Sequence, residues 1–193
     1  MKTFTLSIII VFSTLIISAQ DIGSIQLKEV KSGQSVALGS KIGNKGAFIM
    51  FVDNTCPFVD SYNSRISSFS QKQTEKGYSI LFVNPHEKNN PSTDNLASMQ
   101  KFFSGKNWSG AYYSDPENKL VKLLGATKLP EVFFVQVSGN QLKVLYQGAI
   151  DDNPQNAAEV TKNYAENALS SFESGAKIQP AKMPAMGCRI KRF

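Results

Sequence analysis

The chain has 193 residues, of which 41% are hydrophobic and 19% charged, a balance typical of globular proteins and unlike disordered or multi-span membrane chains. Its two cysteines are too few for a disulfide-dense scaffold or a four-cysteine metal site. The net charge of +6 includes Lys2 and three cations among the last five residues, and without these four groups 17 cations face 15 acidic residues. No basic stripe with interleaved aromatics is present, so we expect no nucleic-acid partner.

The first 20 residues have the pattern of a secretory signal peptide. Lys2 precedes an apolar run over 4–17, and Ser18, Ala19 and Gln20 provide a cleavage region. The run is shorter than the roughly 20 residues of a membrane span, so an uncleaved anchor is the less favoured alternative. We therefore expect residues 1–20 to direct the mature protein to the periplasm or the exterior, with no stable membrane span after cleavage. Disulfides can form in such compartments.

Strands and helices alternate along the mature chain. Apolar runs and alternation predict strands over 25–30, 35–38, 47–52, 78–83, 111–113, 132–137 and 142–146. Helical spacing and capping residues predict helices over 57–76, from about 93 to 103, before Gly125, and over 156–173. This order predicts an α/β fold with a central mixed sheet flanked by helices, a strand extension at its N-terminus and a closing hairpin.

The mature chain is expected to form one domain and one tail. No repeat or low-complexity block interrupts residues 21–174, which we assign to the domain. From residue 175 to 193, Pro180, Pro184 and Gly187 prevent regular structure, so this segment is expected to be an extended tail that carries Cys188.

Cys56 is the first candidate for chemistry. It follows the buried strand over 47–52 and precedes Pro57, a residue suited to the first turn of a helix. Amide donors and the positive end of the helix dipole favour the reactive thiolate at such a place. The alternative is an inert, buried cysteine.

Leu129 and Pro130 come directly before the strand over 132–137. A proline at the start of a strand often does no more than end the preceding segment. In this order of elements, however, Pro130 lies where a cis-proline would face the N-terminus of the first long helix. It could then help to present backbone groups to an extended partner beside Cys56. Pro57, Leu129 and Pro130 are therefore our candidate substrate-binding residues.

Four motifs in order resemble a known family. They are Asn-Thr-Cys-Pro-Phe-Val at 54–59, Pro-Glu-Val-Phe-Phe at 130–134, Tyr-Gln-Gly-Ala-Ile-Asp-Asp-Asn at 146–153 and Gly-Cys-Arg-Ile-Lys at 187–191. Together they resemble exported bacterial thioredoxin-like proteins of the redoxin group, relatives of alkyl hydroperoxide reductase and thiol-specific antioxidant proteins. The resemblance implies a thioredoxin-like fold and thiol–disulfide or antioxidant chemistry.

The chain also departs from the patterns of these families. Members commonly read Cys-x-x-Cys-Pro, and Asp53 stands in place of the first cysteine. A carboxylate there would oppose ionisation of Cys56. The peroxiredoxin pattern Pro-x-x-x-Thr-x-x-Cys is also broken, because Ile49 replaces its proline and Asp53 its threonine, although Cys56 keeps the place of the peroxidatic cysteine.

Cys188 has three interpretations at this stage. It could be a resolving thiol that forms a disulfide with Cys56, half of a structural disulfide, or a free thiol that pairs with another protein. His86, the only histidine, lies in a loop after the strand over 78–83; it could approach the active-site end, but a solvated loop histidine is the favoured expectation. One histidine and two cysteines do not predict a metal site.

These observations predict a thiol-based oxidoreductase outside the cytoplasm. Cys56 would attack a disulfide or a small peroxide, and Cys188 would resolve the product. The partners would be protein thiols or disulfides, or small peroxides, together with an external thiol reductant. No cofactor is expected, since the chain has no Gly-rich dinucleotide fingerprint. The alternative is a thioredoxin-fold binding or scaffold protein that has lost catalysis, and the direction of the redox chemistry is not fixed by the sequence.

Overall fold

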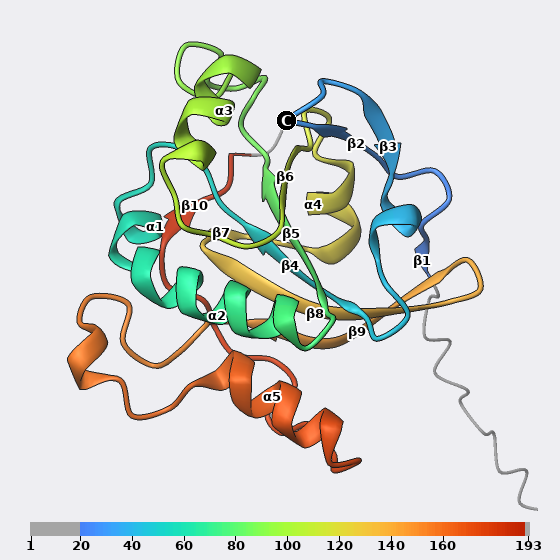
Figure 1. The fold of residues 1–193 in the computed structure, drawn as a ribbon, viewed down its shortest axis with the longest axis vertical. Helices are drawn as coiled ribbons and strands as arrows, with labels where there is room; N and C mark the ends of the chain where they lie inside the picture. The colour runs from blue at the N-terminus through green and yellow to red at the C-terminus, as the bar shows by residue number, and fades with distance from the viewer. Residues whose placement is uncertain (1–19, 192–193) are drawn as a thin grey trace, which may run out of the picture.

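Eight strands build the central sheet of the protein, which is seen here in a computed structural model that describes residues 20–191 (Figure 1). In spatial order they are β1 (Gln20–Asp21), β9 (Gln141–Gly148), β8 (Glu131–Ser138), β4 (Ala47–Phe51), β5 (Ser79–Asn84), β6 (Ala111–Ser114), β2 (Gln26–Glu29) and β3 (Ser35–Ala37). The neighbours β4, β5 and β6 run parallel, and all other neighbouring pairs are antiparallel. The predicted α/β class with a mixed sheet is confirmed.

Helices cover the sheet. They are α1 (Pro57–Ser61), α2 (Asn63–Glu75), α3 (Leu96–Ser104), α4 (Lys119–Leu124) and α5 (Tyr164–Glu173), with 3-10 turns at Leu38–Lys41 and Ala157–Glu159. In Figure 1, helix α2 crosses in front of the sheet and α5 lies below α2. Two surface ion pairs join them, Lys72 with Glu166 at 3.0 Å and Lys76 with Glu173 at 2.8 Å.

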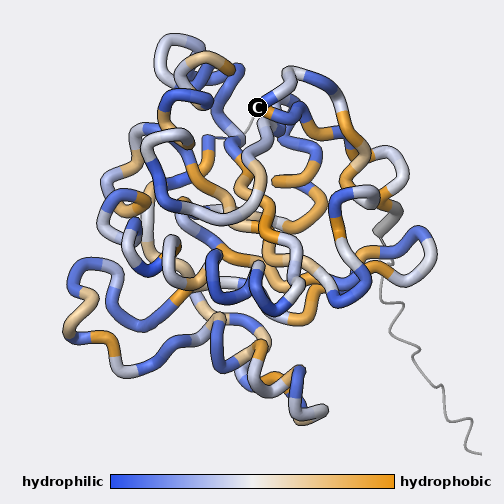
Figure 2. Tube along the Cα trace, viewed as in Figure 1, coloured by the Kyte–Doolittle hydropathy of each residue, from blue (hydrophilic) through white to orange (hydrophobic). Residues whose placement is uncertain are grey.

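The core lies between the sheet and these helices. All five residues of β4 are buried, and Figure 2 shows apolar segments at the sheet and polar ones on the outward side of α2. The ring of Phe48 in β4 stacks on Phe134 in β8 with centroids 4.6 Å apart and meets Phe69 in α2 edge-on at 4.9 Å. Burying one such ring stabilises the fold by about 1.5–3 kcal/mol. The strand that leads into Cys56 is therefore firmly fixed.

The last predicted helix begins eight residues later than expected. The prediction of a helix over 156–173 is wrong for its first part, because α5 starts only at Tyr164. The Asp152 carboxylate accepts the amide hydrogens of Thr161 and Lys162 at 2.9 and 3.1 Å and holds that segment in a loop. The predicted helix over 57–76 is present, but it divides into α1 and α2 at Tyr62.

The tail folds back across the domain, as Figure 1 shows in red. It forms the short strand β10 (Cys188–Arg189), which pairs antiparallel with β7 (Lys128–Leu129). Gly148, with φ +138°, allows the tail to pass, since a Cβ there would lie 1.7 Å from the carbonyl oxygen of Met183. Apart from β10, the described part of the tail, residues 175–191, contains no named helix or strand.

The predicted signal peptide falls outside the described residues, apart from Gln20, which belongs to β1. Within residues 20–191, no helix has the length and apolar character needed to cross a membrane.

Candidate redox site

Cys56 lies at the point where β4 leads into the first helix. It is the N-cap residue of α1, Pro57 occupies the first helical position, and only 3% of Cys56 is exposed. The amide of Val59 donates to the Cys56 carbonyl at 3.0 Å and starts the helical hydrogen-bond pattern. The predicted strand–cysteine–proline–helix arrangement is thus present.

Cys56 forms a disulfide with Cys188. The sulfur atoms are 2.09 Å apart, the Cα atoms are 6.0 Å apart, and the two residues are separated by 132 positions in the sequence. The interpretation of Cys188 as a free thiol is therefore wrong for this structure. The disulfide has the pairing that both the resolving-thiol and the structural interpretation require.

The tail pairs with β7, the short strand that ends directly before Pro130. The Leu129–Pro130 peptide bond is cis, and Cys188 lies directly opposite Leu129 in the β7–β10 pair. The Cys56 sulfur lies 3.3 Å from the Leu129 carbonyl oxygen. The structure thus brings Cys56, Cys188 and Leu129 together, with Pro130 next to them, whereas Pro57 is exposed at the start of α1.

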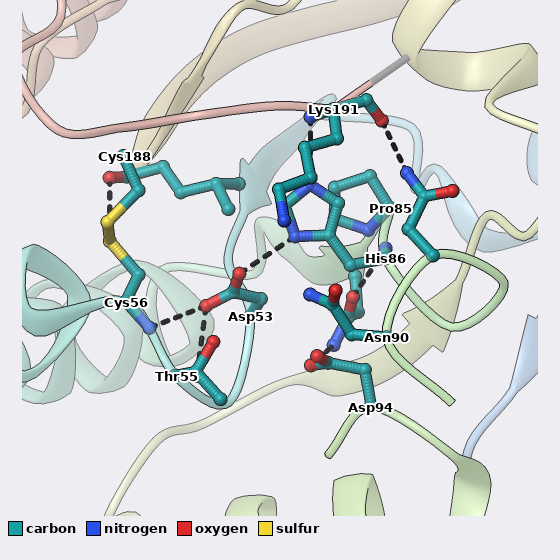
Figure 3. Close-up of polar contacts among 12 residues, drawn as sticks. Asp53, Thr55, Cys56, Pro85, His86, Asn90, Asp94, Cys188 and Lys191 are labelled. Atoms are coloured by element: carbon teal, nitrogen blue, oxygen red, sulfur yellow. Dashed lines mark hydrogen bonds and ion pairs between the residues drawn. A yellow bond between two sulfur atoms is a disulfide. The ribbon is translucent and has the colours of Figure 1, made fainter. Parts of the chain in front are cut away.

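The Asp53 carboxylate binds backbone amides at the start of the first helix and a ring nitrogen of His86. Its Oδ1 accepts the amide hydrogen of Cys56 at 2.7 Å and that of Thr55 at 3.0 Å, while its Oδ2 lies 2.8 Å from Nδ1 of His86 (Figure 3). Asp53 is 4% exposed, so a carboxylate is buried beside the disulfide and satisfied by three donors.

His86 is not the solvated loop residue that the sequence suggested. It is 3% exposed, and it lies between Asp53 and the tail. The backbone amide of Lys191 donates to His86 Nε2 at 3.0 Å, so Nε2 carries no proton and Nδ1–H donates to Asp53. We assign a neutral imidazole with its proton on Nδ1. The expectation failed because the tail, which is distant in the sequence, covers this loop.

Backbone groups hold the end of the tail. Ile190 donates its amide hydrogen to the Thr127 carbonyl at 3.0 Å, and its side chain is 4% exposed. The Lys191 carbonyl accepts from Asn89 Nδ2 at 2.8 Å. Backbone hydrogen bonds at Ile190 and Lys191 therefore fix the tail after Arg189, and burial of the Ile190 side chain adds to them.

A buried polar cluster supports the loop before Cys56. The Asp94 carboxylate accepts from the Asn54 amide at 3.1 Å and from Asn84 Nδ2 at 2.7 Å. The Tyr112 hydroxyl donates to Asn54 Oδ1 at 3.1 Å. Burial raises the pKa of Tyr112 well above its ordinary value, so this hydroxyl remains a donor at neutral pH.

The surroundings of Cys56 favour a thiol once the disulfide is reduced. The sulfur is buried, the Asp53 carboxylate is nearby, and the Leu129 carbonyl can accept from an S–H group. The helix dipole opposes these effects, but α1 has only five residues, and Asp53 already occupies the adjacent amides.

The sequence held a signal for Asp53 and a weaker one for His86. An Asp three residues before a helix start is typical of a side chain that caps backbone amides. His86 follows β5, and the carboxyl ends of the parallel strands β4 and β5 meet at one edge. Within the described part of the chain, no group of three His, Cys, Asp or Glu residues could hold a metal ion.

Several solved structures of known proteins are similar to this chain in fold. A protein of Geobacillus kaustophilus, described as an uncharacterized conserved protein, is 24% identical with a TM-score of 0.78, covering 91% of this chain and 92% of its own. A hypothetical protein of Sinorhizobium meliloti 1021 is 20% identical with a TM-score of 0.75, covering 91% and 94%. A Chlorobium tepidum protein provisionally named as the thiol:disulfide interchange protein DsbE is 19% identical with a TM-score of 0.54, covering 81% and 95%.

These similarities show a shared, thioredoxin-like fold, as the sequence predicted. A search of the curated proteins finds no match. The sequence profile of the AhpC/TSA family matches residues 19–141, which is more than half of the chain. The chain therefore belongs to the AhpC/TSA family.

Proposed function

We propose that the protein is a thiol–disulfide oxidoreductase that works outside the cytoplasm, with Cys56 and Cys188 as its redox couple. The observation that carries the proposal is the position of the disulfide, which joins the start of α1 to a strand paired with Leu129 beside cis-Pro130. The tail thereby lies as an extended peptide added to a strand, with its cysteine bonded to Cys56. When the tail dissociates from β7, a partner that contains a cysteine can pair with the same strand.

The couple exchanges two electrons and two protons with its partner. A partner with two thiols reduces the Cys56–Cys188 disulfide through a mixed disulfide and leaves as a disulfide itself, and the reverse reaction oxidises the dithiol. The direction depends on the two reduction potentials. An external thiol supplies the electrons for a reductive cycle, and no organic cofactor is needed.

Disulfide exchange fits the site better than peroxide reduction. Both reactions need a thiolate, but a peroxidatic Cys56 would also have to meet a free peroxide, and Cys56 is 3% exposed and bonded to Cys188. The fold shared with the Chlorobium tepidum protein named as a thiol:disulfide interchange protein supports the same choice. The predicted signal peptide supports a location outside the cytoplasm.

A turnover assay tests this proposal. The wild type should catalyse reduction of insulin disulfides by a thiol reductant, and both Cys56→Ser and Cys188→Ser should abolish the catalysis. Hydrogen peroxide consumption, measured in parallel, should be no faster than the uncatalysed reaction. Disulfide reduction that survives in Cys56→Ser would overturn the proposal.

A second function, that of a binding or scaffold protein without catalysis, is favoured by one observation. Asp53 stands where the resembled pattern has a cysteine, and its carboxylate accepts the amide hydrogens of Thr55 and Cys56 at the start of the first helix. In this alternative, the disulfide has only a structural role and holds the tail on the domain. It predicts no turnover by the wild type and the same partner binding before and after reduction.

A further inference from the structure

The docked tail shows how an extended peptide can bring a cysteine to Cys56. In the antiparallel pair of β10 and β7, Cys188 lies opposite Leu129. Its sulfur is bonded to Cys56 (Figure 3). A peptide that pairs with β7 in the same register therefore places its own cysteine at the Cys56 sulfur. The surroundings of the tail residues indicate which side chains such a peptide can carry.

The position directly before the cysteine fits glycine best. Gly187 occupies it in the tail, and a Cβ there would lie 2.0 Å from the carbonyl oxygen of Leu129 and 2.8 Å from its carbonyl carbon. Both atoms belong to the backbone of β7, so a change of side-chain rotamer cannot relieve the contact. Glycine allows this close approach of two backbones. A larger residue must move the peptide away from β7, together with the cysteine that follows.

The position two residues after the cysteine fits a large aliphatic side chain. Ile190 occupies it in the tail, is 4% exposed and belongs to the hydrophobic core. Its amide donates to the Thr127 carbonyl at 3.0 Å and so extends the contact between tail and domain. Arg189, which lies between the cysteine and this residue, is exposed. The position directly after the cysteine is therefore open to many side chains.

From this we propose that the preferred substrate is an extended protein segment that reads glycine, cysteine, any residue and a large aliphatic residue, and that it binds β7 in place of the tail. This inference rests on the proposed function. Cys56 is only 3% exposed with the tail docked, so the tail has to leave β7 before the segment binds. Substrate selection and tail release thus involve the same strand.

The first step joins the segment to the reduced protein. The Cys56 thiol loses its proton, and the thiolate attacks the substrate cysteine that follows the glycine. The disulfide of the substrate breaks, and its second cysteine leaves as a thiolate and takes a proton. The product of this step is a mixed disulfide between Cys56 and the segment on β7.

The second step lets the tail replace the segment. The Cys188 thiolate attacks the Cys56 sulfur, and the substrate cysteine leaves as a thiolate and is protonated. The substrate gains two electrons and two protons, which the protein loses as the Cys56–Cys188 disulfide forms. Because the tail and the segment use the same strand, this step also releases the product.

The test measures mixed-disulfide formation with Cys188→Ser, in which Cys56 is the only cysteine. The reference peptide is Ala-Met-Gly-Cys-Arg-Ile-Lys, the sequence of residues 185–191, with nitrothiobenzoate on its cysteine as a coloured leaving group. Three further peptides carry Ala for Gly, Asn for Ile or, as the matched control, Gln for Arg. Each rate is divided by the rate of the same peptide with 2-mercaptoethanol.

The Ala and Asn peptides should each react about tenfold or more slowly than the reference, and the Gln peptide should stay within about threefold of it. Reduced wild type, which keeps both cysteines, should give the same order. Equal corrected rates for the Gly and Ala peptides would overturn the inference. A small neutral disulfide that reacts as fast as the reference peptide would overturn the assignment of a protein segment.

A second variant tests the competition between tail and segment. Gly187→Ala, added to Cys188→Ser, places a Cβ against the Leu129 backbone on the protein's own tail and should release the tail. The reference peptide should then react about fivefold or more faster, since a larger fraction of the protein is open to it. The matched control is Met186→Ala, at a side chain that is 60% exposed, which should leave the rate unchanged. An unchanged rate in the Gly187→Ala variant would contradict the shared strand.

Failure of the inference and failure of the proposed function give different results. If wild type turns over protein disulfides but its rates do not depend on the residues around the cysteine, only the inference is wrong. If wild type shows no turnover with any disulfide, the proposed function is wrong.

Discussion

Replacing Asp53 with Asn creates a conflict that the structure makes explicit. The substitution keeps the shape of the side chain, and Oδ1 can still accept the amides of Thr55 and Cys56. At the other oxygen, however, an NH2 group replaces an acceptor and faces the Nδ1–H of His86, which now lies 2.8 Å from Oδ2. Two donors then face each other.

His86 cannot remove the conflict by moving its proton. Its Nε2 accepts the Lys191 amide at 3.0 Å, so a proton on Nε2 would break that hydrogen bond. One buried hydrogen bond is therefore lost in either tautomer, and a buried donor without a partner costs about 1–3 kcal/mol. We expect Asp53→Asn to lower the free energy of unfolding of the oxidised protein by about 2 kcal/mol.

A double-mutant cycle tests the physical cause. Lys191→Pro removes the amide hydrogen that His86 accepts, so in this background the imidazole can change tautomer and accept from Asn at position 53. The cost of Asp53→Asn should then fall by about 1 kcal/mol or more in urea unfolding, and ¹⁵N NMR should show the proton moved to Nε2. The control Asp60→Asn, at an exposed carboxylate, should change stability by less than about 0.5 kcal/mol in both backgrounds. Additive effects of Asp53→Asn and Lys191→Pro would refute the assigned tautomer and the link between the site and the tail.

Three further predictions concern the tail and the loops. Cys188→Ser opens a bridge between residues 132 positions apart, and should lower the free energy of unfolding by about 5 kcal/mol in urea; a loss below about 1 kcal/mol would contradict this. Gly148→Ala places a Cβ 1.7 Å from a tail carbonyl and should cost about 3 kcal/mol or more, whereas Gly139→Ala, with nothing within 4 Å, should cost only about 1–2 kcal/mol for its left-handed backbone. The hydrogen bond from Thr161 holds the pKa of Asp152 at about 2, so its contribution to stability is complete above about pH 4 and is lost as the pH falls through 2; an NMR titration with a midpoint near 4 would contradict this.

Much of the fold could be predicted because its signals are local. The continuous apolar run over 47–52 and the other apolar or alternating segments predict the strands. The alternation of strands and helices, with a closing hairpin, predicts a mixed sheet. The start of the last helix could not be predicted from helical spacing alone. A side chain at Asp152, outside that helix, holds the amides of Thr161 and Lys162, and this contact is invisible to periodicity.

The placement of Cys56 and Pro130 at element boundaries was predictable, because the sequence itself puts a cysteine after an apolar run and a proline before one. The pairing of Cys56 with Cys188 was one of several open alternatives, since nothing local fixes the path of an irregular tail. The burial of His86 follows from that path as well, because Lys191 meets it from 105 positions away in the sequence. Contacts made by the tail are therefore the part of the site that the sequence could not show.

The measurement that tests the central claim most directly is the reduction potential of the Cys56–Cys188 disulfide. The protein is equilibrated in glutathione buffers of stepped ratio, the free thiols are alkylated, and the reduced fraction is read by mass. A potential above about −250 mV is the predicted result, because a couple that exchanges electrons with thiols must lie near their potentials. A potential below about −300 mV would mean that the disulfide is a structural link and would contradict the proposed redox function.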